Sequence, residues 1–290
     1  MVRLKGRPKE GLKGRPFKAG LTGGPLFGPF LMGVWQMGFG GKGANQAVMA
    51  GILGAEVYVI TCLGSDVYRD MTIENFKNNN VITDYIQTVD GSSGVAPIWV
   101  DESGQNRIIV IPGANDLIDG SLAIEALEKI GKPDVLVGQF EIPMNVNEQV
   151  FSYAYKNGVE TVLNPAPANK PSDILLQNTS WFIPNEIEFE EIYGDIFNEN
   201  NLLLFAKNID TNVVVTLGEK GCAYIKNNSV KIIKADSVKA IDTTGAGDAF
   251  VGAFSFALAS KLDIEECLKL ALKKATDSVT KKGTQSSYMN

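Results

Sequence analysis

The chain has 290 residues, of which 44% are apolar and 21% are charged, a composition typical of a globular protein with a sizeable core. It contains no histidine. This excludes Ser/His/Asp triads, histidine-bound zinc and histidine acid–base catalysis, so a general base must be Asp, Glu, Lys, Cys or Tyr. The three cysteines (Cys62, Cys222 and Cys267) are scattered along the chain, and we expect each to be a small buried apolar residue.

The charge is unevenly distributed. Residues 1–40 contain seven Lys or Arg and one acidic residue, whereas the whole chain has a net charge of −6, so the remainder is acidic. An acidic body argues against a nucleic-acid partner. The sequence shows no apolar run long enough to cross a bilayer and no signal peptide. We therefore expect no membrane partner and a location in the cytoplasm, with the nucleus as a second compartment.

From about residue 45 the chain alternates between helical and strand patterns. Runs rich in β-branched residues predict strands, and runs with apolar residues at helical spacing predict helices. In chain order, the expected elements are helix 45–53, strand 57–63, helix 66–79, strands 95–100 and 108–111, helix 121–130, strand 135–139, helix 146–157, strands 160–163 and 181–183, helices 186–193 and 200–209, strands 213–217, 222–225 and 230–233, and helices 245–260 and 263–281.

This alternation indicates an α/β fold: a mostly parallel central sheet with helices on both faces. The two strands joined by the turn "DESGQN" interrupt the rhythm and predict a small β lid at about residues 94–111. We expect one domain at 39–290, preceded by an atypical basic, Gly/Pro-rich segment at 1–38. Ligands of such sheets bind beyond the carboxyl ends of the strands.

The stretch "IDTTGAGDAF" places a glycine-rich turn at the start of a helix. Glycine lets backbone N–H groups approach an anion, and the helix dipole favours negative charge there. A carboxylate on this turn would repel a resting phosphate. Asp248 is explained if it takes the proton of a hydroxyl that attacks a phosphoryl group bound by the neighbouring amides. The alternative is a purely structural helix cap.

Two motifs carry a resemblance to a known family. "DTTGAGDAFVGAF" resembles the C-terminal signature of the ribokinase-like (PfkB) carbohydrate kinases, and "FGGKGANQA" resembles their N-terminal signature. The resemblance continues in order through "GANDLI", "QFEIP", "NPAPA", "PNEIE", "TLGEKGC" and "KKGTQSSY", over about residues 38–288. It implies a ribokinase-like fold and ATP-dependent phosphorylation of D-ribose at its 5-hydroxyl. The alternatives are a related sugar or nucleoside kinase, or a catalytically impaired relative.

The resemblance also implies roles for individual residues. Asp248 would be the general base, and the Gly245–Ala246–Gly247 turn would form the anion hole. The residues expected to contact ribose, besides Asp248, are Gly41, Lys42, Gly43, Asn45 and Glu141. Those expected to line the nucleotide are Asn185, Thr216, Gly218, Gly221 and Gly247.

Two ions are implied. Asn185 and Glu188 would organise Mg²⁺ through its waters, as the oxygen preference of that ion requires. A monovalent K⁺ site behind the anion hole would use Asp242, Thr244, Ser278, Lys281, Gly283 and Ser287.

We also expect a homodimer formed through the lid. A lone hairpin cannot bury the apolar residues that its strands carry. These residues are Val95, Ile98, Val100, Ile109 and Ile111.

Residues 1–38 depart from the family. Its members open with a strand reading about Gly-Ser-x-x-x-Asp, whose Asp binds the sugar, and nothing like it occurs here. We expect the sheet to lack a strand, and the missing charged hydrogen bond to cost about 1.5–3 kcal/mol, or tenfold to a hundredfold in ribose affinity. Ribose would then be phosphorylated poorly or not at all. A second interpretation of the repeated "LKGRP" is an arm for the DNA minor groove.

Overall fold

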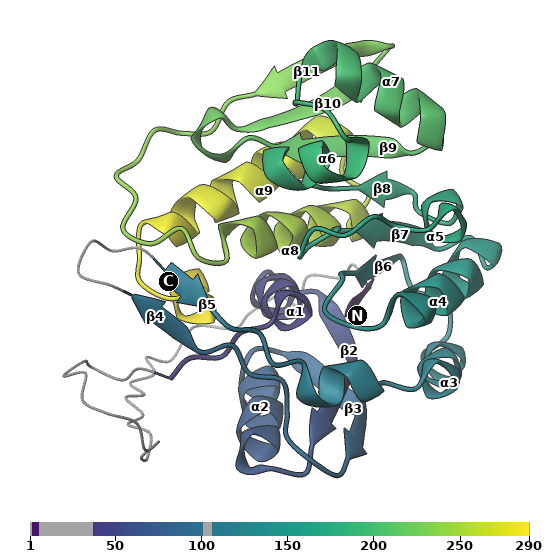
Figure 1. Ribbon diagram of the computed structural model, residues 1–290, viewed down its shortest axis with the longest axis vertical. Coiled ribbons are helices and arrows are strands. Elements are labelled where there is room, and N and C mark those ends of the chain that lie inside the picture. The colour runs from purple at the N-terminus through teal and green to yellow at the C-terminus, as the bar shows by residue number, and fades with distance from the viewer. Residues whose placement is uncertain (1, 6–36, 101–105, 290) are drawn as a thin grey trace.

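The computed structural model describes residues 2–5, 37–100 and 106–289. Within these ranges a nine-stranded sheet runs through the molecule in the order β11-β10-β9-β8-β7-β6-β1-β2-β3 (Figure 1). Its strands are β1 Val2–Lys5, β2 Glu56–Gly64, β3 Val81–Val89, β6 Val135–Gly138, β7 Glu160–Leu163, β8 Trp181–Phe182, β9 Asn212–Thr216, β10 Cys222–Lys226 and β11 Ser229–Ile233. Among the described strands of this sheet, β1 and β10 run in the direction opposite to the others, so the sheet is mostly parallel, as predicted.

Helices cover both faces of the sheet (Figure 1). Those of the described chain are α1 Lys42–Ile52, α2 Val67–Asn78, α3 Gly120–Ile130, α4 Met144–Lys156, α5 Asp173–Gln177, α6 Glu186–Tyr193, α7 Glu199–Ile209, α8 Ala246–Ala259 and α9 Ile264–Val279, with short 3₁₀ turns η1 Gly113–Leu117, η2 Gly218–Lys220 and η3 Gln285–Tyr288. None of these described helices is long and apolar enough to span a bilayer.

Alternating side chains divide the core into two layers. Along β6, Val135 and Val137 pack with α1, α8 and α9, whereas Leu136 between them packs with α3 and α4. This follows from the pleat, which directs successive side chains to opposite faces. A strand buried on both faces therefore reads as a continuous apolar run. The three cysteines are buried as predicted.

The lid prediction is confirmed. Strands β4 Ile98–Val100 and β5 Asn106–Ile108 pair antiparallel as a separate two-stranded sheet, and Val95 and Ile111 form a further bridge. The second strand ends at residue 108, whereas the sequence placed it at 108–111. Beyond residue 108 the N–H of Ile109 donates to the carbonyl of Pro97 at 3.1 Å and Ile111 forms the bridge with Val95, so the pairing continues without a regular ladder.

The prediction that the sheet lacks a strand is wrong. β1 lies in the interior of the sheet and pairs antiparallel with both β2 and β6. Its four residues, "VRLK", are too short a run to be recognised in the sequence, and pairing on two sides compensates for that length. Apart from β1 and residues 37–38, the segment 1–38 lies outside the described residues. The prediction that this segment lacks a sugar-binding carboxylate falls on those residues and stays a prediction.

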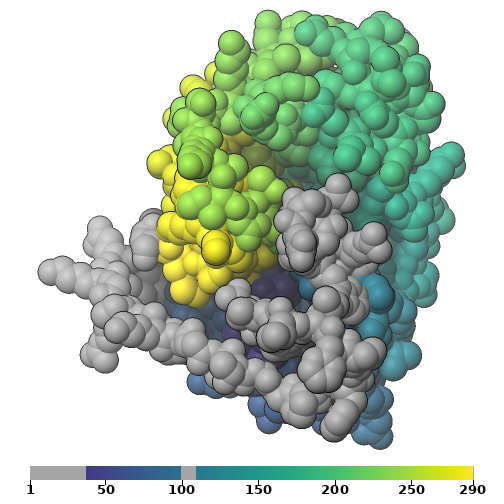
Figure 2. All heavy atoms as spheres, turned by 60° about the vertical axis from the view of Figure 1, so that its left-hand side comes forward, coloured from purple at the N-terminus to yellow at the C-terminus, as the bar shows by residue number. Residues whose placement is uncertain are grey.

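Helix α1 begins three residues earlier than predicted, at Lys42 after Gly41. Asn45 and Gln46 therefore lie on the first turns of a helix that packs against α8. The residues that follow α9 lie next to α1, because Gln285 donates to Asn45, and next to the segment before α8, because Gly283 donates to Asp242. Figure 2 shows them, in yellow, between the light-green segment that precedes α8 and the blue-purple N-terminal part that contains α1 and α2.

Candidate active site

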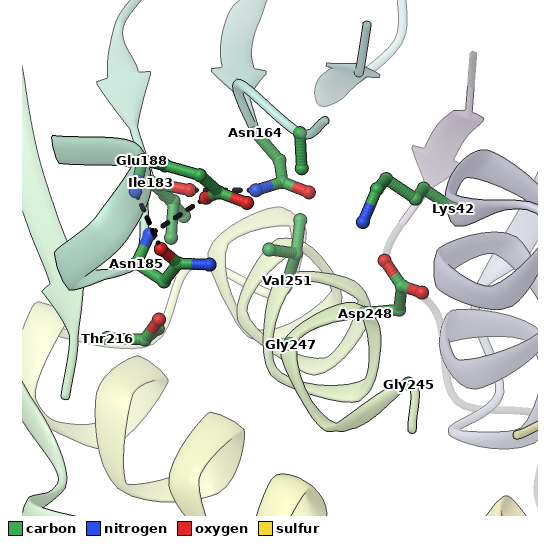
Figure 3. A pocket seen from close by; sticks show the side chains of 11 residues that line it. Lys42, Asn164, Ile183, Asn185, Glu188, Thr216, Gly245, Gly247, Asp248 and Val251 are labelled. Atoms are coloured by element: carbon green, nitrogen blue, oxygen red, sulfur yellow. Dashed lines mark hydrogen bonds between the residues drawn. The ribbon is translucent and has the colours of Figure 1, made fainter. Parts of the chain in front are cut away.

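A pocket opens at the carboxyl ends of β7, β8 and β9, beside the N-termini of α1 and α8 (Figure 3). This is the edge at which open α/β sheets bind ligands. The side chains and backbone that line it are those of Lys42, Asn164, Ala166, Ile183, Asn185, Glu188, Thr216, Gly245, Gly247, Asp248 and Val251. The pocket therefore brings together predicted residues from both signature motifs and from the segments between them.

Asp248 is the charged residue on the first turn of α8, and only 7% of its surface is exposed. Its carboxylate accepts two hydrogen bonds from α1: Nδ2 of Asn45 donates to Oδ2 at 2.7 Å, and Nε2 of Gln46 donates to Oδ1 at 3.1 Å. Burial raises the pKa of Asp248, while the positive charge of Lys42 and the two amide donors act in the opposite direction. A carboxylate that is buried and still hydrogen-bonded in its charged form suits a general base.

The glycine turn in front of Asp248 has a conformation that requires glycine at one position. Gly245 has φ +78°, and its carbonyl accepts a hydrogen bond from the hydroxyl of Tyr288 at 2.7 Å. A Cβ on Gly247 would meet no atom within 4 Å, because this residue faces the open pocket. The backbone N–H of Ala246 donates to the carbonyl of Thr243 at 3.3 Å. The turn is thus fixed from behind and open towards the pocket.

Residues predicted to contact the sugar cluster at the start of α1. The backbone N–H of Lys42 donates to Oε2 of Glu141 at 2.6 Å, and Gly41 lies against the same carboxylate. Burial raises the pKa of Glu141, and the hydrogen bond from Lys42 lowers it. Figure 3 shows the Lys42 amine pointing across the pocket towards Asp248. Gly43 lies in the first turn of α1.

Asn185 and Glu188 lie on the opposite side of the pocket and form a capping box at the start of α6. The backbone N–H of Asn185 donates to Oε2 of Glu188 at 2.8 Å, and the N–H of Glu188 donates to Oδ1 of Asn185 at 2.8 Å. Burial raises the pKa of Glu188. Within the described residues, no group of three Cys, Asp or Glu side chains could hold a metal ion by itself.

Thr216 lies beside this capping box, because its backbone forms a bridge with Asn185 at the end of β9. The next residues form the η2 turn, in which the N–H of Leu217 donates to the carbonyl of Gly221 at 2.8 Å. Gly218 opens that turn with φ +57°. Of the residues predicted to line the nucleotide, Asn185, Thr216 and Gly247 line the pocket, whereas Gly218 and Gly221 lie in the turn after Thr216 and are not among its lining residues.

The residues predicted to bind K⁺ come from the loop before α8, from the end of α9 and from the segment that follows α9, and Asp242 joins the first of these to the last. Its Oδ1 accepts from the N–H of Thr244 at 2.9 Å, and its Oδ2 accepts from the N–H of Gly283 at 2.9 Å. The remaining members donate to backbone carbonyls: Ser278 to Ala275, Ser287 to Thr284 and Lys281 to Met289. The two segments that Asp242 joins lie directly behind the glycine turn, which Tyr288 contacts.

The sequence did not indicate several polar residues around Asp248. Asn164, in the "NPAPA" motif, lines the pocket and accepts a hydrogen bond from Gln46 at 3.1 Å. Gln139 donates to Gln46 at 2.6 Å, and Gln285 donates to Asn45 at 3.0 Å. Their positions inside the quoted motifs were the available signal, but an uncharged amide in a motif does not reveal its partner.

Known proteins resemble this chain over most of its length. The sequence pattern of the pfkB family carbohydrate kinases matches residues 31–290. The chain is 37% identical to a deoxyribokinase of Salmonella typhi over 88% of this chain and 85% of that protein. It is 40% identical to a ribokinase of Haemophilus influenzae, over 87% and 85% respectively.

The fold matches as well. The structure of Arabidopsis thaliana ribokinase complexed with ribose and ATP superposes with a TM-score of 0.80 at 29% identity, covering 86% of this chain and 83% of that one. The ribokinase-like α/β fold expected from the motifs is therefore confirmed. The chain belongs to the pfkB family of carbohydrate kinases.

Proposed function

We propose that this protein transfers the γ-phosphoryl group of ATP to the 5-hydroxyl of D-ribose, giving ribose 5-phosphate and ADP. The observation that carries this proposal is the position of Asp248, buried at the N-terminus of α8 beside a glycine turn that opens into the pocket. A base next to backbone donors is the arrangement that phosphoryl transfer to a hydroxyl requires. The ribokinase relatives and the ribose and ATP in the Arabidopsis structure support ribose and ATP as the substrates.

Asp248 would accept the proton of the 5-hydroxyl as its oxygen attacks the γ-phosphorus and the bond to ADP breaks. Backbone N–H groups of the turn at Gly245 to Gly247 would donate to the phosphoryl oxygens, where preorganised donors contribute about 3–4 kcal/mol in the transition state. Lys42, pointing into the pocket, would attract the phosphate charge. Glu141, fixed by the Lys42 backbone, would accept hydrogen bonds from the sugar hydroxyls.

Asn185 and Glu188 fit a role towards Mg²⁺. The capping box engages Oε2 of Glu188, and the residue lines the pocket, so its other oxygen can accept from metal-bound water. A single carboxylate suits Mg²⁺, which keeps several waters and takes further oxygens from phosphates. When bound, the ion would neutralise the negative charge of the phosphates.

The loops of Asp242 and Gly283 fit a monovalent activator. They supply carbonyl and hydroxyl oxygens, and they contact the glycine turn from behind. K⁺ bound there would stabilise the turn conformation in which the amides face the phosphate. Activity measured in K⁺ against Li⁺ at equal ionic strength tests this role.

A second substrate, 2-deoxy-D-ribose, is favoured by the 37% identity to the Salmonella typhi deoxyribokinase. The two sugars differ only in the 2-hydroxyl, and a site built to bind that hydroxyl discriminates strongly against its absence. The ratio of kcat/KM for ribose and 2-deoxyribose separates the two functions. A ratio below one would assign the deoxy sugar.

Impaired ribose binding remains part of the proposal. Since β1 lies between β2 and β6, the sheet does not lack a strand there. The loss that we still propose is that of a carboxylate hydrogen bond to the sugar, which would lower ribose affinity about tenfold to a hundredfold. The experiment is a coupled ADP-release assay on this chain and on a version fitted with a family-like first strand. Equal, robust activity of both proteins would show that residues 1–38 are a harmless replacement.

We also propose a homodimer formed through the lid. Four apolar side chains at this hairpin are 46–62% exposed, although each would be stabilised by burial. They are Ile98, Ile109, Val110 and Ile111. Two copies of the hairpin could cover them mutually.

A further inference from the structure

The carboxylate of Asp248 is the end point of a chain of side-chain amides that begins at the half-buried Asn75 and continues through buried residues. Nδ2 of Asn75 donates to Oε1 of Gln285 at 2.8 Å, and Nε2 of Gln285 donates to Oδ1 of Asn45 at 3.0 Å. Nδ2 of Asn45 then donates to Oδ2 of Asp248 at 2.7 Å. The chain thus joins α2, η3 and α1 to the first turn of α8, and every amide directs its NH₂ group towards Asp248.

A second, shorter chain reaches the other carboxylate oxygen. Nε2 of Gln139 donates to Oε1 of Gln46 at 2.6 Å, and Nε2 of Gln46 donates to Oδ1 of Asp248 at 3.1 Å. The amides of both chains nearest to Asp248 are at most 5% exposed, so water does not compete for these bonds. The two chains meet at one carboxylate, each at a different oxygen.

The direction of these bonds has a physical cause. An ionised carboxylate only accepts, so Asn45 must present its NH₂ group to Asp248 and its carbonyl to Gln285. Gln285 must then present its NH₂ group to Asn45 and its carbonyl to Asn75. Aligned amides polarise one another, which strengthens each bond in the series. Reversing any amide would place a carbonyl oxygen against the next carbonyl or against the carboxylate.

From this geometry we infer that Gln285 and Asn75 are positioning residues: through Asn45 they orient the carboxylate of Asp248 and favour its charged, proton-accepting form. The inference rests on the proposed role of Asp248 as general base. Neither Gln285 nor Asn75 is among the described residues that line the pocket, so each acts through another side chain. The C-terminal turn η3 thereby contributes to catalysis without touching substrate.

Other titratable groups also face Asp248 and must be kept constant in a test. Lys42 comes from α1, Glu141 follows β6, Glu188 lies on α6 and Tyr288 lies in η3; each interacts electrostatically with Asp248. A substitution of similar size at Gln285 interrupts the chain of amides and leaves these four side chains in place.

The decisive variant is Gln285→Glu. The new carboxylate cannot donate to Asn45, so Asn45 turns its NH₂ group towards that carboxylate and its carbonyl towards Asp248. We expect kcat at neutral pH to fall about tenfold or more, with the KM for ATP within about twofold of wild type. The acid limb of the kcat profile moves to higher pH. The ¹³C titration of the Asp248 carboxyl, assigned with Asp248→Asn, moves the same way without any substrate.

The matched control is Asn201→Asp, which converts a buried amide on α7 that donates to the carbonyl of Ile196. It lowers the melting temperature but leaves kcat and the Asp248 titration unchanged. If Gln285→Glu does not fold, Asn75→Asp makes the same reversal from a partly exposed position, with a smaller shift in the same direction. Because these two variants add a negative charge near Asp248, the neutral Gln285→Met, which can neither donate nor accept, must move the Asp248 titration in the same direction. An unchanged Asp248 titration in folded Gln285→Met overturns the inference. A chain without turnover whose Asp248 titration still shifts contradicts the proposed function alone.

Discussion

At the scale of single residues, two opposing effects set the chemistry of Asp248. Removal from water raises its pKa, while Lys42, Asn45 and Gln46 stabilise the charged form. The sequence alone pointed to this residue as a general base, because a carboxylate on a turn that binds a phosphate would otherwise repel it. It could not predict the amide donors, since Asn45 and Gln285 lie 240 positions apart in the chain. Uncharged amides have no sequence signal that identifies a distant partner.

Asp248→Asn should reduce kcat by about 10²–10⁴-fold, because it removes the proton acceptor while preserving the shape of the side chain. Nucleotide binding, measured by calorimetry, should remain within a few-fold of wild type. The exposed Asp277→Asn on α9 is the control and should keep full activity. A near-wild-type kcat for Asp248→Asn, in an active parent, would remove this residue from the mechanism.

The same variant has a predicted pH signature in stability. Because the folded state raises the pKa of Asp248, it binds this proton more tightly than the unfolded chain does. The contribution of Asp248 to stability is therefore greatest at low pH and is lost as pH rises through its folded pKa. Melting temperatures from about pH 4 to about pH 8 should show wild type losing stability relative to Asp248→Asn. A constant difference would contradict the raised pKa.

At the scale of elements, two glycines at the start of α8 have different roles: Gly245 is needed for the backbone conformation, and Gly247 leaves the pocket open. Gly245→Ala should lower the melting temperature, because φ +78° costs a side chain about 1–2 kcal/mol and the methyl would collide with Thr284 and Tyr288. Gly247→Ala should fold normally, because its methyl meets no atom, yet it projects where the phosphoryl group would bind. We expect kcat/KM for ATP to fall about tenfold or more. Equal melting temperatures for the two variants, or full activity of Gly247→Ala, would contradict this division.

Strands differ in how well the sequence predicts them. The interior strands β6, β7 and β9 each contain adjacent buried apolar residues and were predicted within about one residue at each end. The sheet-edge strand β3 was missed, because the half-buried Thr83 and Gln87 and the exposed Asp84 and Thr88 break the apolar pattern. β1 was missed for its length alone. The sequence therefore predicts a strand with two buried faces better than it predicts a half-buried strand at the edge of the sheet.

At the scale of the whole molecule, the pocket depends on segments from the entire described chain meeting at one sheet edge. The α/β alternation predicted that edge, and the motif order predicted which segments reach it. The sequence could not predict that η3 would join α2 to α8, because contacts among loops depend on the completed packing. Asn75 and Gln285, 210 positions apart, meet only in the folded state.

The proposed dimer is also a property of the whole molecule. Light scattering at micromolar concentration should give twice the chain mass. Val110→Lys should give the monomer, because it places a charge in the apolar surface at the hairpin, where Val110 is 62% exposed. Ile196→Lys, an equally exposed site outside the lid, should remain dimeric. A wild-type monomer under these conditions would rule out the lid interface.

The most direct test of the account is sugar-dependent ADP release by the purified, folded chain with MgATP and K⁺, using ribose, 2-deoxyribose and no sugar. We expect ADP release that requires a pentose, favours ribose, needs a high ribose concentration, and falls at least about a hundredfold in Asp248→Asn. No pentose-dependent release from folded protein, or equal release by Asp248→Asn, would contradict a sugar kinase with Asp248 as its base.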